Sequence, residues 1–164
     1  MRSLLTARWQ QHLCRMAVTS HTLGANSSRE ENMDFVSTRI ITDDIHGLVQ
    51  FYERLGLKAT WLGDEFAELE TPSCKLAIGT TRTMQQFFAG AAVAASNRSV
   101  IIEFRVEDAD AEYKKLQAMG AHVEQAPITQ PWGNRSLLFR DPDGNLINFF
   151  TPVSREATQR FARK

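Results

Sequence analysis

The side chains that could carry out chemistry are few and scattered along this chain. The histidines and cysteines are His12, His21, His46, His122, Cys14 and Cys74. A divalent metal needs several imidazole, thiolate or carboxylate groups converging on one point, and no CxxC pair or histidine cluster provides them. Ser37 has no histidine at a recognised motif spacing, and no GxSxG or phosphate-binding glycine loop occurs. Glu103 is the one credible proton-transfer group.

The elements that would position these groups form an internal repeat. Asp44 and Asp108, both candidate helix N-caps, lie 64 residues apart, and the candidate helix stops Gly56 and Gly120 have the same spacing. A strand rich in β-branched residues precedes each helix. Three strand candidates follow each helix: 57–63, 65–71 and 74–80, then 121–127, 134–140 and 145–151. The order βαβββ therefore occurs twice, which indicates duplication.

Helical periodicity predicts which side of each helix is buried. Leu48 and Tyr52 lie on one face of the first helix. In the second helix we expect Tyr113 and Leu116 to point inward and Glu112 to face solvent.

Three segments of the chain resemble the vicinal oxygen chelate superfamily, which includes glyoxalase I, bleomycin-resistance proteins and extradiol dioxygenases. They are ITDDIHGLVQFYERLGL, VEDADAEYKKLQAMGA and QPWGNRSLLFRDPDGNLINFF, and the resemblance spans residues 35–152. The DPDGN element, Asp141 to Asn145, predicts a tight turn between two strands. The resemblance implies an α+β fold in which two paired βαβββ modules form an open, eight-stranded, barrel-like cavity with the site inside.

Enzymes of this superfamily hold a divalent metal through histidine and glutamate on the first and last strand of each module. The resemblance places those positions at Ser37, Ile78, Ile101 and Asn148. None of these residue types is a usual ligand for such a metal. We therefore expect a metal-free protein without a cofactor, and the balance leans against an enzyme. The alternative is a metal-dependent lyase, isomerase or dioxygenase with displaced ligands, using Glu103 with Asn148 or Glu70.

The open question at this cavity is what replaces the metal. Arg39 and Glu103 occupy equivalent positions of the repeat, five residues before Asp44 and Asp108. Residues two apart share a strand face, so we expect both side chains to face the cavity. They either neutralise each other as a buried ion pair or hold a polar ligand, and the two roles are compatible.

Aromatic residues complete the predicted pocket. Trp61 and Trp132 are candidates for stacking on a flat ligand, and Trp132 lies in loop 126–133, where we place about six extra residues of the second half. The predicted ligand-binding residues are Ser37, Arg39, Trp61, Ile101, Glu103, Arg105, Trp132, Asn148 and Phe150. Such a mixture of apolar walls and a few polar anchors is typical of small-molecule sites.

The predicted organisation is a leader, 1–32; a domain, 33–153, made of modules 34–80 and 99–153 with a linker, 81–98; and a closing helix, 154–164. The leader is interpreted as a flexible or adventitious extension, with a targeting segment or a docked helix as alternatives.

Composition limits the partners. The formal net charge is zero, and residues 30–164 carry 19 − 4 = 15 basic against 19 acidic residues, which disfavours nucleic acid. No apolar run is long enough to span a membrane, and two unpaired cysteines fit the cytoplasm. We expect a homodimer with Phe87, Phe88 and the closing helix at its interface. The predicted function is sequestering or carrying a small aromatic or amphipathic molecule; an interaction module without a ligand is a further possibility.

Overall fold

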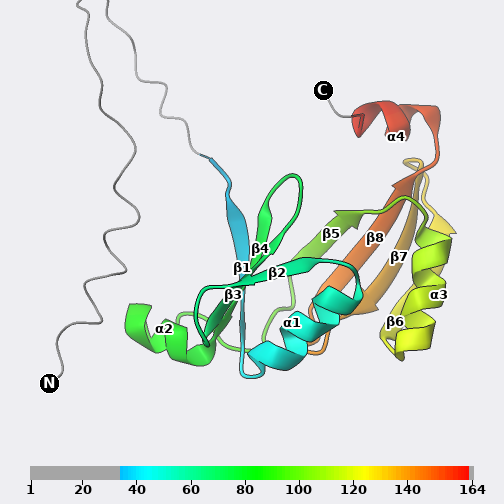
Figure 1. Cartoon of the computed structure of the whole chain (residues 1–164). Helices are drawn as coiled ribbons and strands as arrows, with labels where there is room; N and C mark the ends of the chain where they lie inside the picture. The colour runs from blue at the N-terminus through cyan, green and yellow to red at the C-terminus, as the bar shows by residue number, and fades with distance from the viewer. Residues whose placement is uncertain (1–33, 163–164) are drawn as a thin grey trace, which may run out of the picture. The chain divides into compact units, whose positions relative to one another are not determined.

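The computed structural model describes residues 34–162, and the leader predicted for residues 1–32 lies outside them. From Phe35 onward the chain forms one unit with two modules in the predicted order (Figure 1). The first module comprises β1 (Ser37–Thr42), α1 (Ile45–Arg54), β2 (Lys58–Trp61), β3 (Phe66–Glu70) and β4 (Lys75–Thr80). The second comprises β5 (Ile101–Arg105), α3 (Ala109–Met119), β6 (His122–Thr129), β7 (Asn134–Arg140) and β8 (Leu146–Pro152). Two short helices, α2 (Thr81–Phe87) and α4 (Arg155–Arg160), follow β4 and β8.

Both modules contain a four-stranded sheet of the same topology. The strand orders are β1-β4-β3-β2 and β5-β8-β7-β6. In each sheet the first and last strands of the module pair in parallel, and the remaining pairs are antiparallel. The two sheets do not close into a barrel. The predicted α+β fold of paired modules with an open arrangement is confirmed.

Local capping explains where the helices begin and end. The Asp44 carboxylate accepts a hydrogen bond from the Gly47 amide at 2.9 Å, and Asp108 caps α3 in the same way. Gly120 ends α3 with a φ of 68°, a left-handed conformation that a residue without a Cβ adopts at little cost. Ser154 caps α4 through its side chain. All four of these predicted boundaries are confirmed.

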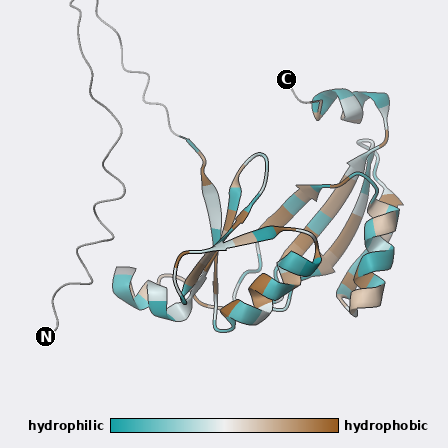
Figure 2. Ribbon diagram, viewed as in Figure 1, coloured by the Kyte–Doolittle hydropathy of each residue, from teal (hydrophilic) through white to brown (hydrophobic). Residues whose placement is uncertain are grey.

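Each sheet has two chemically different faces. We call the face against the helices the helix face and the opposite one the open face. The helix faces carry Ile40, Leu69 and Ile78 in the first sheet and Leu137, Phe139 and Ile147 in the second. In Figure 2 the strands carry apolar residues, brown, and polar residues, teal, in alternation.

The core joins the two modules through α1. The Phe51 ring lies 6.4 Å from the Phe139 ring, and the Tyr52 ring lies 6.5 Å from the Phe104 ring, measured between centroids. Tyr52 is fully buried, and its hydroxyl donates to the Asp141 carboxylate at 2.9 Å. Helix α1 of the first module therefore packs against the sheet of the second, and one continuous hydrophobic cluster includes both helix faces.

The two short helices cover part of the open faces. In α2, the Thr83 hydroxyl lies against the open face at Gly79, where an added Cβ would stand 3.0 Å from its oxygen. After α4, the Phe161 ring packs against the Phe150 ring at 4.9 Å between centroids, tilted by 51°. Within residues 34–162, each helix is too short or too polar to span a bilayer.

The sequence had suggested that the extra residues of the second half lie in a loop. The structure places some of them in a strand instead. Strand β6 continues to Thr129 and contains two register irregularities, between Val123 and Gln125 and between Gln125 and Ile128. Only a short turn, 130–133, remains before β7. The reason is that bulges absorb extra residues while the strands stay paired.

Candidate functional site

The open face of the first sheet carries the predicted residues Ser37 and Arg39. Arg39 pairs with Ala77 of β4, which pairs with Glu68 of β3, so these three side chains share the open face. Arg39 is exposed, and its guanidinium carbon lies 4.6 Å from the centroid of the Phe66 ring. Stacking on that ring holds the charge at the surface of the sheet.

The open face of the second sheet carries a polar pair at its centre. The Asn148 side-chain amide donates to the Glu103 carboxylate at 2.7 Å across β5 and β8. Asn148 is 9% exposed, and its side-chain oxygen is buried with no hydrogen-bond partner among residues 34–162. A buried polar atom without a partner is costly, so this oxygen is a ready acceptor for a donor group brought by another molecule.

A groove of about 930 Å³ separates the two modules above the end of α1. Residues 102–106, in β5 and just after it, line one side, and residues 70–76, from the end of β3 to the start of β4, line the other. Its apolar walls are Leu55, Leu57, Leu76, Ile102, Phe104, Val106, Phe149, Phe150 and Phe161. Of the predicted site residues, Glu103, Arg105 and Phe150 line it.

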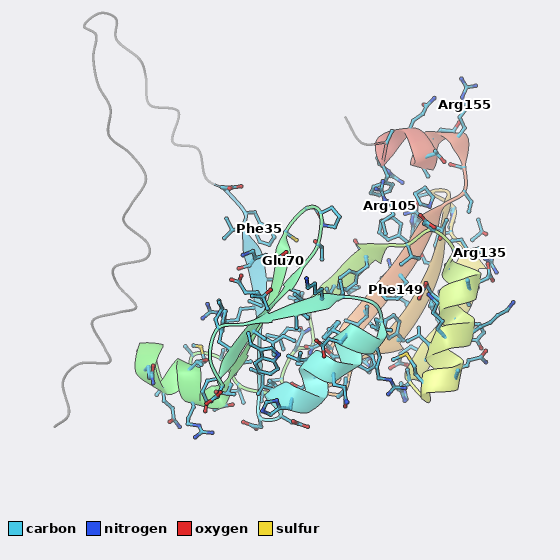
Figure 3. All side chains as sticks on the ribbon, in the orientation of Figure 1. Phe35, Glu70, Arg105, Arg135, Phe149 and Arg155 are labelled. Atoms are coloured by element: carbon cyan, nitrogen blue, oxygen red, sulfur yellow. The ribbon has the colours of Figure 1, made fainter. Side chains whose placement is uncertain are left out.

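Acidic side chains outnumber basic ones along this groove. Of its two cationic side chains, Lys75 pairs with Glu68 at 2.5 Å, and Arg105 keeps its charge and donates to the Phe161 carbonyl, beneath α4 in Figure 3. Three carboxylates line the groove: Glu70, Glu103 and Glu112. The groove thus combines aromatic walls with acceptors that a cationic or hydrogen-bond-donating group would satisfy.

Glu112 is a groove residue that the sequence interpretation had placed in solvent. One of its oxygens pairs with Lys115 at 2.6 Å, while the other is buried with no hydrogen-bond partner in the described part of the chain. Its side chain is only 17% exposed. The expectation failed because the first turn of α3 abuts the groove, a contact that helical periodicity cannot reveal.

The two tryptophans do not meet the groove. Trp61 pairs with Ala67 on the helix face of the first sheet, and its ring lies 5.1 Å from the His46 ring of α1. It is therefore on the opposite face from Arg39. Trp132 is 57% exposed in the turn between β6 and β7, and neither residue lines the groove.

Arg39 and Glu103 do not neutralise each other within the chain. Among the ion pairs of residues 34–162 neither side chain has an oppositely charged partner. Arg39 stacks on Phe66, and Glu103 accepts from Asn148. The ion pair, one of the two roles predicted for these residues, does not form within residues 34–162, because Arg39 and Glu103 lie on the open faces of two separate sheets.

The four positions where the superfamily's enzymes hold metal need one correction. Ile78 is fully buried on the helix face, and the residue equivalent to Asn148 is Ala77, because Ala77 pairs with Arg39 as Asn148 pairs with Glu103. The set is thus Ser37, Ala77, Ile101 and Asn148. Hydroxyl, methyl, alkyl and amide groups do not fit a divalent metal that requires imidazole or carboxylate ligands. In the described part of the chain, no three histidine, cysteine or acidic side chains are arranged to bind a metal.

Comparison with known proteins agrees with this fold. A sequence profile of the Glyoxalase/Bleomycin resistance protein/Dioxygenase superfamily matches residues 34–149. The chain belongs to this superfamily, so the resemblance found in the sequence is confirmed. Uncharacterized protein YraH of Bacillus subtilis (strain 168) is 29% identical over 125 residues, which cover 72% of this chain and 98% of that protein.

Solved structures share the architecture. A protein of unknown function from Agrobacterium tumefaciens str. C58 has a TM-score of 0.64 and 27% identity, covering 74% of this chain and 95% of its own. A glyoxalase/bleomycin resistance protein/dioxygenase family enzyme from Burkholderia phytofirmans PsJN has a TM-score of 0.66 and 19% identity, covering 74% and 100%. The likeness to the second protein shows the fold alone.

Sequence reasoning missed the module 1 side of the groove. Leu55, Leu57 and the 70–76 connection line it, but no motif marks them. Phe104 in β5 and Val106 just after it were a hint, because one helix cannot cover apolar residues over the whole length of this segment.

Proposed function

We propose that the protein binds a small amphipathic molecule, without a metal, in the groove between its modules. The observation that carries the proposal is the combination of aromatic walls with the buried, unpartnered oxygen of Glu112. A ligand with a flat apolar body would contact Phe104 and Phe149, and a cationic or donor group would meet the carboxylate. Sequestering or carrying such a molecule requires no catalytic group.

Two features favour a donor or cationic group over an anionic one. The carboxylates of Glu70, Glu103 and Glu112 line the groove, whereas Arg105 and Lys75 already have acceptors within the chain. An anion would approach the three carboxylates that line the groove. Like charges near a desolvated site raise the cost of binding.

Thermal-shift measurements with two matched probe sets test this proposal. We expect aromatic amines to raise the melting temperature and aromatic carboxylates of the same size to leave it unchanged. At a ligand concentration 100 times Kd the native state gains about 2.7 kcal/mol. Equal stabilisation by both sets, or by neither, would contradict the proposed ligand class.

Two substitutions locate the site. Glu112→Gln keeps the shape of the groove and removes its charge, so the response to aromatic amines should fall. Glu53→Gln, an exposed residue of α1 that does not line the groove, is the matched control and should respond as wild type does. An unchanged response of Glu112→Gln would place the ligand elsewhere.

A metal-dependent lyase, isomerase or dioxygenase is the competing function. Stabilisation of the purified protein by Zn²⁺, Ni²⁺, Mn²⁺ or Fe²⁺ that a chelator reverses would favour it and overturn the metal-free proposal. Elemental analysis of the same sample should find well below one metal ion per chain. Action in the cytoplasm remains part of the proposal and is tested by localising the full-length chain in cells.

A further inference from the structure

Helix α4 leads Phe161 into the groove and is packed tightly at its first turn. Of the six residues of α4, only Ala157 is buried. Its amide donates to the Ser154 hydroxyl at 3.1 Å, and a Cβ added at Gly133 would stand 3.2 Å from the Ala157 side chain. The first turn of α4 is therefore fixed against the turn that precedes β7, and Ser154 is the point about which the rest of the helix can move.

The far end of α4 is held by one aromatic ring and two arginines. The Phe161 ring packs against Phe150, on the open face of the second sheet, at 4.9 Å between centroids. Arg105 donates to the Phe161 carbonyl, and the Arg160 guanidinium carbon lies 5.0 Å from the centroid of the Phe161 ring. Both arginines are exposed, where such contacts are weak. Because a helix of six residues is unstable by itself, we expect this end of α4 to open more easily than the sheet.

The sheet beside Phe150 contains buried acceptors that Phe161 cannot satisfy. Asn134 is 7% exposed and Asn148 is 9% exposed, and the side-chain oxygen of each has no hydrogen-bond partner in the described part of the chain. Along the strands they lie on either side of the cross-strand pair of Phe150 with Ser136. Buried acceptors without partners raise the free energy of this arrangement. Water or a donor group admitted beside Phe150 would lower it.

From these contacts we infer that Phe161 is a displaceable plug of the groove. Its ring occupies the place against Phe150 that the ring of a bound aromatic amine takes, and α4 lifts about Ser154 to release it. The groove therefore exchanges an internal aromatic ring for an external one when it binds. The inference rests on the proposed function, because the groove that the plug closes is the proposed binding site.

Removing the ring tests the plug by its effect on the binding of tryptamine, an aromatic amine, measured by isothermal titration calorimetry. The apparent Kd is the intrinsic Kd divided by the fraction of molecules that are open, so Phe161→Ala should bind tryptamine at least about fivefold more tightly than wild type. Arg155→Ala is the matched control, because Arg155 is exposed and projects from α4 away from Arg105 (Figure 3), and its Kd should not change. Equal or weaker binding by Phe161→Ala would mean that Phe161 is a fixed wall of the groove and would overturn the inference.

Hydrogen exchange of the protein without tryptamine tests whether α4 opens by itself. The amides of Thr158 and Phe161 donate within this helical turn. They should exchange at least about 100-fold faster than the amide of the buried Leu116 in α3. Phe161→Ala should raise the rate at Thr158 at least about tenfold and leave Leu116 unchanged, whereas Arg155→Ala should change neither. Exchange at Thr158 as slow as at Leu116 would overturn the inference.

Together the two measurements separate the plug from the proposed function. With tryptamine bound, the amides of α4 should exchange faster than before, while those of β5 and β8 should exchange more slowly. Binding of tryptamine with slow exchange in α4 would support the proposed function and overturn the plug. No binding by wild type or by Phe161→Ala, with fast exchange in α4, would contradict the proposed function and with it the role of Phe161, although α4 would be shown to open.

Discussion

Replacing Tyr52 by phenylalanine removes one oxygen from the contact that joins the two modules. The hydroxyl is fully buried and donates to the Asp141 carboxylate at 2.9 Å, and the same carboxylate oxygen also accepts from the Asn145 amide at 2.8 Å. A hydrogen bond to a charged group contributes about 1.5–3 kcal/mol. Because Asp141 keeps a second donor, we expect Tyr52→Phe to lower the free energy of unfolding by about 1.5 kcal/mol.

Urea denaturation of wild type and variant at pH 7.5 measures this loss. The matched control is Tyr113→Phe, because Tyr113 packs against the same core and its hydroxyl has no hydrogen-bond partner among residues 34–162. The control should change stability by less than about 0.5 kcal/mol. Equal effects of the two substitutions would refute the assignment of stability to the Tyr52 hydrogen bond.

The same pair of variants has a distinct signature in alkali. Burial, and next the charge of Asp141, raise the pKa of Tyr52 well above 10.0. As the pH rises past about 10, tyrosine ionises in the unfolded chain before it can ionise in the native one. Wild type should therefore lose stability that Tyr52→Phe retains, and the gap between them should narrow between pH 9 and pH 11. A constant gap would contradict this linkage.

Three further substitutions test other parts of the structure by urea denaturation. Burial, together with nearby carboxylates, raises the pKa of Asp143; Asp143→Asn should therefore stabilise the protein at pH 7, and the gain should vanish at pH 3, where the carboxyl is protonated in both states. Asp108→Ala removes the N-cap of α3 and should cost about 1 kcal/mol, whereas Glu107→Ala should cost less than about 0.5. Gly79→Ala would place a Cβ 3.0 Å from the Thr83 oxygen and should cost about 1–3 kcal/mol through overpacking, and a neutral result would mean that α2 is not fixed against the open face.

Sequence-local features were sufficient to predict the elements and their order. Asp44, Asp108 and Ser154 cap helices, and Gly120 ends one, because these roles depend on hydrogen bonds and backbone angles within a few residues. The repeat spacing of 64 residues gave the pairing of the two modules. The superfamily followed from the same segments.

The sequence predicted less well which face of a sheet a residue lies on when the prediction aligned the two halves of the chain across their loops. The match from Pro72 to Pro142 pointed to Ile78, whereas strand pairing makes Ala77 the counterpart of Asn148. Side chains alternate along a strand, so an error of one residue exchanges the open face for the helix face. Trp61 was predicted only as a candidate for stacking on a ligand, and its pairing with Ala67 puts it beside α1.

The sequence alone determined the βαβββ repeat and the helix ends, because both are carried by residue type and short-range spacing. Tertiary structure alone decided that α1 lies between the modules, with Tyr52 on Asp141 and Phe51 near Phe139. That packing separates Arg39 from Glu103 and opens a groove beside Glu112. The physical reason is that contacts between residues far apart in the chain depend on how a whole helix face fits against a whole sheet face. Periodicity within one segment shows only that the segment has an apolar face, and not what that face packs against.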